Sequence, residues 1–489
     1  MRQNKFTRLA ATLGVAATLA GCALGGASGP SLGGRGVQVL EKAFSTGSRE
    51  AIVSYRYQNA ADLTRLVDAG MDVWGVDSAR GIAYGQVSPA QLTELRRRPD
   101  AVQVETGPQI YNSFGAGYHT YDTMLEDLGK MAASRPDICK LVDLGPTWET
   151  TKGKANRRIW GLHVSRGDAS AKPGVIYLGN HHAREIVTPE ISLNVAHMIV
   201  DQEGKDPAMT AAVQNLDIWI VPMVNPDGHA LAALGNDWRK NTNATNLFFD
   251  VGPYGAGVDL NRNYAHHWGE GGASTRPQDP TFRGAGPGSE PETQAVMKLA
   301  SSRPFTFLMT YHSFSNLILW PWGYTDEAPP SKEMIAVGQK LGKLSGYKPQ
   351  QSKDLYRTSG DLTDWAFGAR GILSYTTEIG SWGDGFDPPY REVARFWREN
   401  EPGARLLLQL ADRPAAINGP EVVVDGGRVS APGARRIEIF RGQKGTPGTG
   451  QILSEGSLVA TGRGPRQLAY IQAQGADGQW GPATATWSD

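Results

Sequence analysis

The chain is poor in cysteine and has no net charge, and both features narrow what it can be. It has two cysteines, Cys22 and Cys139, among 489 residues. Its 49 basic residues are matched by 49 acidic ones, so composition gives no electrostatic case for nucleic acid as a partner. Glycine is abundant at 60 residues but aperiodic, which indicates many turns rather than a fibre. The length is ample for one large core and one or two small domains.

Residues 1–22 are predicted to be an export signal. A basic segment precedes the apolar stretch Leu9 to Leu19, and small residues follow. This stretch is too short to span a bilayer as a permanent helix. The ending Leu19-Ala20-Gly21-Cys22 resembles a bacterial lipobox, in which the cysteine becomes the acylated first residue of the mature protein. An ordinary cleaved signal is the alternative.

Lipidation of Cys22 would determine where the protein is located and would exclude an intramolecular disulfide. Cys139 would then have no partner for an intramolecular disulfide, so the exported fold would rest on its core and on any metal it holds. Several acyl chains on one cysteine hold a protein stably at a membrane surface. We therefore expect an exported protein of the cell envelope, anchored to a membrane as a lipoprotein, or else an extracellular one.

Two segments precede the large central region. Residues 23–48 are rich in Gly and Ser and indicate a flexible tether. Residues 49–107 predict a small α+β domain with strands, helices and a closing strand in sequence. The expected elements are strand 52–57, helix 60–69, strands 73–76 and 82–85, helix 88–95 and strand 102–104.

A pair of potential metal ligands follows the apolar run Val175 to Leu178. The loop after this run contains His182 and Glu185, and ligands in open α/β sheets bind beyond such strand ends. An imidazole nitrogen and a carboxylate oxygen this close together can bind a cation such as Zn²⁺. His181 is the alternative ligand, in a different register.

A catalytic zinc site usually has three protein ligands and one open position, so a third ligand has to come from elsewhere. The best candidate is His312, which directly follows another apolar strand, Phe305 to Tyr311. If the two strands are neighbours, their ends meet at one metal. His266 and His267 are further candidates, but we interpret them as solvated loop residues.

The region 116–412 predicts an α/β fold, with a sheet covered by helices on both faces. Thr188 and Pro189 are expected to begin the helix after the metal loop, with Thr188 as the capping residue. Other expected elements are a helix after Thr120, strand 216–224, helices 289–302 and 331–344, strand 371–379 and helix 390–411.

Residues 419–489 differ in character from the region before them. Short β-type runs alternate with Gly-rich turns, which predicts a small β-sandwich-like domain. This region has no histidine and no clustered carboxylates, so we expect packing or binding of a surface polymer rather than catalysis.

Taken together, these motifs resemble those of the zinc metallocarboxypeptidase family, which includes carboxypeptidase A and bacterial carboxypeptidase T. The resemblance extends from about Tyr118 to Asp412 and keeps the family's motif order. The matching segments are His182-Ala183-Arg184-Glu185, Asn225-Pro226-Asp227-Gly228, Trp238-Arg239-Lys240-Asn241, Asp259-Leu260-Asn261-Arg262-Asn263, His312-Ser313-Phe314, Tyr356 with Asp364-Trp365, and Glu378.

The resemblance implies a mixed twisted β-sheet flanked by helices, one Zn²⁺ bound by His182, Glu185 and His312, and removal of C-terminal residues from peptides. Glu378 is implied to be the general base, and Arg239 the partner of the oxyanion. The implied substrate-binding residues are Asn261, Arg262 and Tyr356 for the terminal carboxylate, with Arg184 in an extended site or behind the ligands.

The resemblance also bears on specificity and on the N-terminal domain. Thr363 falls at the family's main selecting position and Asp361 lies two residues before it. We therefore expect cleavage of apolar and basic C-terminal residues, with Asp361→Ala weakening the basic ones. The 49–107 domain matches the position of the family's inhibitory prosegment, and a spacer or docking module is the alternative. Arg96-Arg97-Arg98 is interpreted as a solvated helix end rather than a processing site.

Two other functions are compatible with the sequence. One is an exported metallopeptidase or amidase that acts on cell-wall peptides. The other is a non-catalytic lipoprotein that retains the fold for binding, which the presence of all three ligands and Glu378 disfavours. We expect a monomer.

Overall fold

The computed structural model describes residues 51–87, 117–235, 237–245, 256–459 and 465–489. The predicted export signal, Cys22 and the 23–48 tether lie outside these residues. The predicted helix 88–95, the triple-arginine segment and strand 102–104 also lie outside them.

An eight-stranded mixed sheet forms the centre of the fold, with the order β10-β9-β11-β8-β6-β7-β5-β4. Its inner strands β11, β8, β6 and β7 are parallel, and antiparallel strands lie towards both edges. The strands are β4 (Cys139–Pro146), β5 (Arg158–Val164), β6 (Gly174–Gly179), β7 (Asp217–Val221), β8 (Phe305–His312), β9 (Leu317–Trp320), β10 (Lys348–Gln351) and β11 (Leu373–Glu378).

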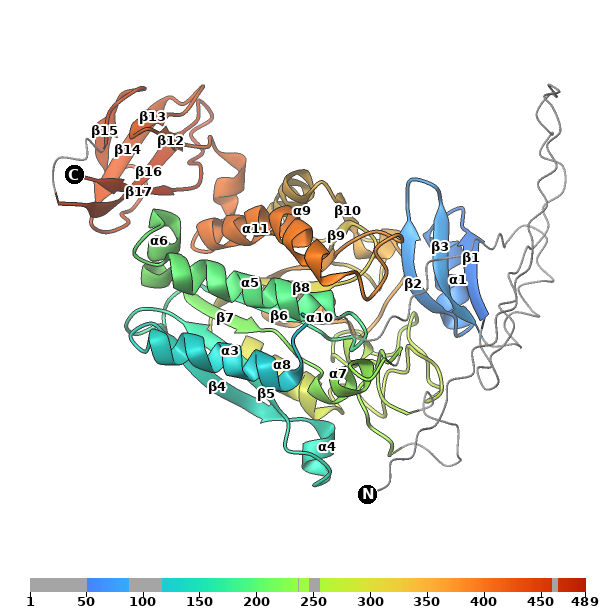
Figure 1. The fold of residues 1–489 in the computed structure, drawn as a ribbon. Helices are drawn as coiled ribbons and strands as arrows, with labels where there is room; N and C mark the ends of the chain where they lie inside the picture. Colours follow the sequence, from blue (N-terminus) through green and yellow to red (C-terminus); the bar gives the residue numbers. More distant parts are fainter. Residues whose placement is uncertain (1–50, 88–116, 236, 246–255, 460–464) are drawn as a thin grey trace, which may run out of the picture. The chain divides into compact units, whose positions relative to one another are not determined.

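Helices cover both faces of this sheet, as Figure 1 shows. The α-helices are α3 (Tyr121–Ser134), α4 (Trp148–Thr151), α5 (Val187–Gln202), α6 (Pro207–Asn215), α7 (Pro226–Ala232), α8 (Pro291–Ser301), α9 (Lys332–Ser345), α10 (Leu362–Arg370) and α11 (Val393–Leu410). Four short 3₁₀ helices accompany them: η1 (Leu260–Arg262), η2 (Ser352–Asp354), η3 (Tyr390–Glu392) and η4 (Pro414–Asn418). The predicted α/β fold is confirmed.

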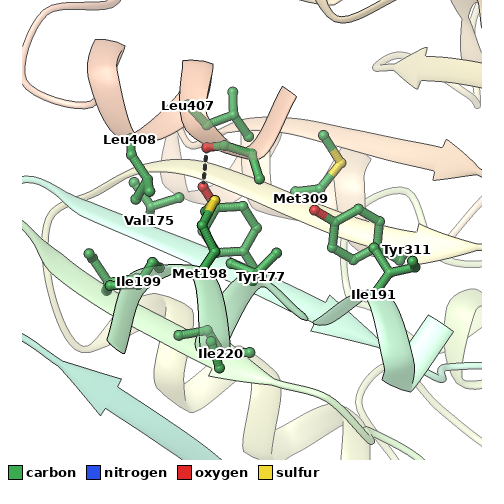
Figure 2. Packing of buried hydrophobic residues seen from close by; sticks show 14 of the residues in the cluster. Val175, Tyr177, Ile191, Met198, Ile199, Ile220, Met309, Tyr311, Leu407 and Leu408 are labelled. Carbon is green, nitrogen blue, oxygen red and sulfur yellow. Dashed lines mark hydrogen bonds between the residues drawn. The ribbon is translucent and has the colours of Figure 1, made fainter. Parts of the chain in front are cut away.

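The uninterrupted apolar character of β6 follows from its central position. Val175 and Tyr177 enter the core that α5 and α11 cover, whereas Ile176 and Leu178 enter the core on the opposite face. A strand buried on both faces needs no polar alternation. Figure 2 shows the first of these cores, in which the Tyr177 hydroxyl donates to the Ala404 carbonyl at 2.7 Å.

Helix α5 begins earlier than the sequence predicts. Its first residue is Val187, and the residue before it makes no side-chain capping bond. The Thr188 hydroxyl, expected as the cap, instead accepts from the Asn180 N–H and donates to the Glu185 carbonyl. The expectation was wrong because the metal loop uses this hydroxyl to fix its own shape. Ser331 and Thr120, by contrast, cap α9 and α3 with their side chains.

The N-terminal sheet contains β1 (Ala51–Arg56), β2 (Asp72–Asp77) and β3 (Ile82–Val87) in the order β1-β3-β2, with helix α1 (Ala60–Asp68) between β1 and β2. The N-terminal sheet shares its apolar core with the central region. Val53, Leu63 and other residues of this unit share one cluster with Leu317, Leu319 and Leu355 of the central region.

The C-terminal region forms two sheets around a common core. Strands β12 (Val423–Asp425) and β13 (Arg428–Ser430) pair with each other. The second sheet has the order β15-β14-β16-β17, from β14 (Arg436–Arg441), β15 (Gln451–Leu453), β16 (Gln467–Gln474) and β17 (Thr484–Ser488). Val429 of one sheet and Ile437 of the other belong to the same buried cluster, as in a small sandwich.

Candidate metal centre and peptide-binding cavity

The loop that follows β6 is almost fully buried and is held by hydrogen bonds within itself. Asn180 adopts a left-handed conformation with φ 58°, which asparagine tolerates better than most residues. Its amide nitrogen donates to the carbonyls of His182 and Ala183. This network fixes the loop, so that His182 and Glu185, exposed by only 4% and 2%, point to one place.

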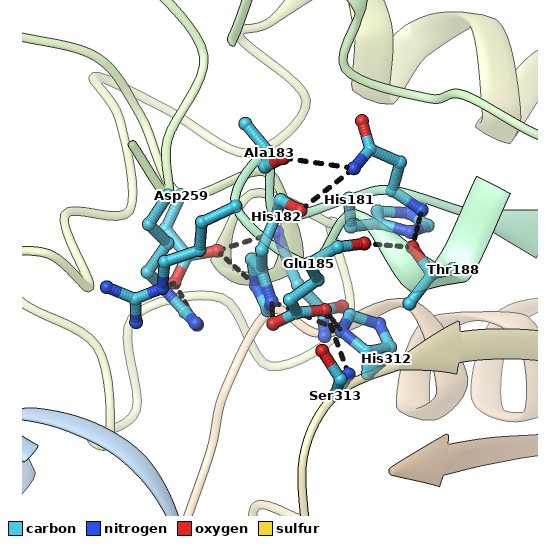
Figure 3. A network of polar contacts seen from close by, with 12 residues as sticks. His181, His182, Ala183, Glu185, Thr188, Asp259, His312 and Ser313 are labelled. Atoms are coloured by element: carbon cyan, nitrogen blue, oxygen red, sulfur yellow. Dashed lines mark hydrogen bonds and ion pairs between the residues drawn. The ribbon is translucent and has the colours of Figure 1, made fainter. Parts of the chain in front are cut away.

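His312 brings the third predicted ligand to the same place, because β8 lies directly beside β6. Its Nδ1 atom lies 3.1 Å from Glu185 Oε2 and 3.1 Å from His182 Nδ1, and His182 Nδ1 lies 2.6 Å from Glu185 Oε1. Figure 3 shows the three side chains pointing towards one another. The donor atoms all lie within 4.8 Å of one another. Two imidazoles and one carboxylate are a donor set that suits catalytic zinc.

His181, the alternative ligand, points away from this cluster. Its Nε2 lies 2.9 Å from the Tyr264 hydroxyl and its Nδ1 lies 3.3 Å from the Thr310 hydroxyl. Complete burial lowers the pKa of His181 well below its usual value. The structure therefore places His182, and not His181, among the potential metal ligands.

Asp259 is a member of the site that the sequence argument did not single out. Its Oδ1 atom lies 3.2 Å from His182 Nε2, and its Oδ2 atom accepts from Arg239 Nη2 at 2.9 Å. A carboxylate on the far nitrogen of a ligating histidine fixes the tautomer and the ring orientation. Although burial opposes ionisation, the Arg239 guanidinium holds the pKa of Asp259 well below its usual range. A single aspartate in a loop gives no sequence signal for this role. The one available indication was that Asp259 lies two residues before Asn261, in a segment already assigned to substrate binding.

Glu378 ends β11 directly beside His312, its partner in the β11–β8 register. Burial, and then the charge of the nearby Glu185, raise the pKa of Glu378 to about 8. The carboxyl of Glu378 lines the same cavity as the three potential ligands. It is therefore placed to exchange a proton with a molecule bound there.

The predicted carboxylate-binding residues lie on η1 and on the segment after η2. Asn261 Oδ1 accepts from the Leu362 N–H at 2.9 Å, so the amide nitrogen of Asn261 is left to act as the donor group. Arg262 is anchored by bonds from Nε to the Gly272 carbonyl and from Nη1 to the Asn261 carbonyl. Its guanidinium carbon lies 6.0 Å from the centre of the Tyr356 ring.

One cavity joins most of the predicted site residues. From the N-terminal unit it receives Val73 and Trp74. From the central region its lining comprises His182, Glu185, Arg239, Asn261, Arg262, His312, Ser313, Leu319, Ser352, Leu355, Tyr356, Thr358, Asp361, Thr363, Thr376 and Glu378. Residues from distant parts of the sequence thus meet at the carboxyl ends of the parallel strands, where α/β sheets bind their ligands.

Asp361 and Thr363 lie at one end of this cavity, at the start of α10. Asp361 caps the helix through the Asp364 N–H at 2.9 Å. It also accepts hydrogen bonds from the hydroxyls of Thr358 and Thr363, at 2.8 and 2.9 Å. The sequence identified Asp361 as a selecting residue but not as a helix cap.

Arg184 is not among the described residues that line the cavity. It forms a bidentate ion pair with Asp72 of β2, and it also donates to Asp237 at 3.1 Å. Its guanidinium carbon lies 4.3 Å from the Phe386 ring centre. Nothing in the sequence of strand β2 indicates that Asp72 pairs with a residue 112 positions away.

His266 and His267 lie in a loop and are partly exposed, and each also stacks on an aromatic ring. The His267 ring lies 3.7 Å from that of Tyr324, and the His266 ring lies 5.4 Å from that of Trp322. The rings of Trp322 and Tyr324 give these imidazoles apolar surface to cover. Neither belongs to the cluster of potential metal ligands within the described residues.

Three comparisons show what the chain is similar to. The sequence profile of a family described as zinc carboxypeptidase matches residues 124–403. A zinc carboxypeptidase of Saccharothrix mutabilis subsp. capreolus is 29% identical over 394 residues, covering 73% of this chain and 88% of that protein. Carboxypeptidase A2 of Mus musculus is 30% identical over 352 residues, covering 69% and 81%. The crystal structure of a carboxypeptidase A from Helicoverpa armigera covers 75% of this chain and 98% of its own, with 23% identity and a TM-score of 0.63.

Proposed function

Because this chain belongs to the zinc carboxypeptidase family, we propose that His182, Glu185 and His312 hold the catalytic zinc with which it removes C-terminal residues from peptides. One observation carries the proposal: the three donor groups share a cavity with a carboxyl group, Glu378, and a cationic residue, Arg262. Metal, base and anion-binding group are the parts that an exopeptidase needs in one place.

Zinc bound there supplies a Lewis acid and lowers the pKa of a bound water. The proton movements belong to Glu378, which accepts a proton from the attacking water and passes it to the leaving nitrogen. Arg239, held in place by Asp259, presents a fixed positive charge to the oxygen that becomes negative in the transition state.

Recognition of the free C-terminus falls to residues across the cavity. Arg262 offers a planar guanidinium that suits a carboxylate, and Asn261 donates beside it. Tyr356 closes over the same group from the segment after η2. An endopeptidase has no use for a cation at the end of its cleft, so this set of residues favours an exopeptidase.

We also propose dual selectivity at the C-terminal side chain. Leu319 and the methyl groups of Thr358, Thr363 and Thr376 give the cavity apolar surface, whereas Asp361 gives it a negative charge. Three donors of the chain already orient the Asp361 carboxylate. It keeps acceptor capacity for a lysine or arginine side chain.

We further propose that the N-terminal unit inhibits the full chain by occupying the substrate's path. Val73 and Trp74 line the cavity, and Asp72 occupies the Arg184 guanidinium. The Val76 N–H donates to the Ser315 hydroxyl, three positions after His312, at 2.9 Å. A peptide entering the site would have to displace these contacts.

For the cell, we propose an exported monomer anchored to a membrane through lipidated Cys22. Support comes from the basic, apolar and small-residue order of residues 1–22. In the described part of the chain, no helix has the length and apolar character that a bilayer crossing requires. Metabolic labelling with a fatty acid, compared between the native chain and Cys22→Ser, tests this anchor, and light scattering of the detergent-free chain from residue 23 tests the monomer.

A matched pair of peptides tests the catalytic proposal most simply. The zinc-loaded chain, after proteolytic release of its N-terminal unit, should remove one residue from a peptide with a free C-terminus. It should leave the same peptide with an amidated C-terminus intact, because Arg262 then has no carboxylate to bind. A chelator should stop the reaction and zinc should restore it. Equal cleavage of both peptides would contradict the exopeptidase proposal.

A further inference from the structure

A second carboxyl group lies behind the selecting end of the cavity. Asp364, one turn into α10, is only 1% exposed. It accepts from the Gly323 N–H at 2.9 and 3.0 Å and from the Tyr324 N–H at 3.2 Å. These bonds tie α10 to the segment after β9. The catalytic proposal gives this residue no role.

Asp361 and Asp364 approach each other at Gly323. A Cβ atom on this glycine would lie 3.1 Å from Asp361 Oδ2 and 3.4 Å from Asp364 Oδ2. The Asp364 carboxyl is within hydrogen-bonding reach of Asp361. Residue 323 has to be glycine, because a Cβ atom there would lie only 2.2 Å from the Thr358 hydroxyl oxygen and would also crowd the two carboxyl groups.

No cation balances this pair within the described residues, where neither carboxyl has an ion-pair partner among lysine, arginine or histidine side chains. The titratable groups that face the pair are Tyr264 and His266 near Asp361 and Tyr324 near Asp364. Two buried carboxylates this close, without a cation, cannot both ionise at low cost. Burial and the Asp361 charge accordingly raise the pKa of Asp364 well above its usual value.

We propose that Asp364 holds a proton beside the Asp361 carboxylate, so that the two form an acid pair, and that a basic C-terminal side chain releases this proton when it binds. Asp361 contacts the basic side chain of the substrate. Asp364 is a positioning residue, which acts through Asp361 by setting the net charge of the pair. The inference rests on the proposed function and deepens it. The substrates concerned are peptides that end in lysine or arginine.

The direction of the pH effect follows from charge. With the proton in place the pair carries one negative charge, and without it two, so a cationic side chain binds more tightly as pH rises. A neutral leucine side chain gains nothing. The lysine side chain itself remains charged up to about pH 10. The ratio of kcat/KM for Lys-terminal over Leu-terminal peptides should therefore increase with pH, by at most about tenfold per pH unit because one proton is exchanged.

This ratio is a useful readout because ionisations common to both substrates, such as that of Glu378, cancel. It should be measured with the zinc-loaded chain, after proteolytic release of its N-terminal unit, on short N-blocked dipeptides from about pH 6 to about pH 9. In Asp364→Asn the amide reproduces the protonated carboxyl: its oxygen accepts from Gly323 and its N–H donates to Asp361. The ratio should then stay constant with pH, with the preference for lysine kept at its low-pH value.

Calorimetry gives a readout independent of turnover. Binding of free lysine, compared in two buffers of different ionisation enthalpy, should release up to one proton more than binding of free leucine does. This difference should disappear in Asp364→Asn. As a control, His266→Gln should keep the pH dependence, which excludes the neighbouring imidazole as the titrating group. Asp361→Asn should lose the preference for lysine at every pH.

A pH-independent ratio in an active native enzyme would overturn the acid pair and leave the carboxypeptidase proposal intact. The same pH dependence in Asp364→Asn as in the native chain would also overturn it. If the zinc-loaded chain, freed of its N-terminal unit, neither hydrolyses the dipeptides nor binds the free amino acids, both proposals fail together.

Discussion

The N-terminal sheet and the four-stranded sheet of the C-terminal region, here called the C-terminal sheet, flank the catalytic region in the sequence, and they meet it in different ways. The N-terminal sheet sends Asp72 onto Arg184 and places Val73 and Trp74 in the cavity lining. The C-terminal sheet contacts helix α6, where Tyr470 receives a hydrogen bond from Asn215 at 2.8 Å. Within the described residues, none of the C-terminal sheet lines the cavity.

The contrast shows that the place of attachment decides what an added domain can do. The site lies at the carboxyl ends of the parallel strands, and of the described residues in the two flanking sheets only those of the N-terminal sheet reach these ends. Its contacts also include charge and can therefore compete with a substrate. The C-terminal sheet attaches by an apolar cluster of Ala211, Leu468 and Tyr470, and the ion pairs of its region, Lys444 with Asp412 and Glu421 with Lys340, involve no residue of the cavity lining. Contacts of this kind contribute stability.

The largest effect should come from the catalytic region itself. Glu378→Gln removes the group that moves the proton, so kcat should fall by about 10³-fold, while the zinc content stays at one per chain. Peptide hydrolysis and elemental analysis of the same sample check this. Activity close to the native level would show that the chemistry does not depend on Glu378. The cavity would then no longer be the catalytic site against which the two flanking sheets are compared.

The preference for basic C-termini should change next most strongly. Asp361→Asn keeps a helix cap for α10 but removes the charge, which is expected to cost about 2 kcal/mol, or about thirtyfold in kcat/KM, with Lys-terminal peptides. Leu-terminal peptides should be cleaved at nearly the native rate. A parallel loss with both peptides would mean that Asp361 acts through the fold rather than by contact with substrate.

The proposed inhibition predicts a gain of activity. In the uncleaved chain, Asp72→Asn removes the buried charge that pairs with Arg184, and peptide hydrolysis should increase by about tenfold because a buried ion pair no longer holds the N-terminal unit. Arg184 stays paired with Asp237, so the cavity itself should be preserved. The same substitution should have no effect once the N-terminal unit has been removed, and unchanged activity of the uncleaved variant would refute inhibition.

The smallest effect belongs to the C-terminal sheet. Tyr470→Phe removes the hydrogen bond from Asn215 and should lower the free energy of unfolding by about 1 kcal/mol, as measured by urea denaturation. The kcat/KM of the variant should equal that of the native chain. A loss of activity in the folded variant would remove the distinction between the two flanking sheets.

Much of the site could be predicted from the sequence because its residues follow strands. His182, His312 and Glu378 each stand at or just after the end of an apolar strand, and parallel neighbours bring such ends together. The remaining parts depended on contacts that leave no periodic signal. Asp259 is one acidic residue in a loop, and its bond to His182 spans 77 positions.

The errors have the same origin in tertiary contacts. Thr188 has the right chemistry for a helix cap, but the metal loop uses its hydroxyl. Asp72 could not be recognised, because a single aspartate on a short strand has no feature that predicts a partner in another domain.

The central claim is that one zinc ion is held by His182, Glu185 and His312. Anomalous diffraction from crystals of the zinc-loaded full chain, recorded on both sides of the zinc absorption edge, tests it directly. We expect one strong anomalous peak per chain, between the two imidazoles and the Glu185 carboxylate. A peak at another set of residues, or none in an active preparation, would contradict the account.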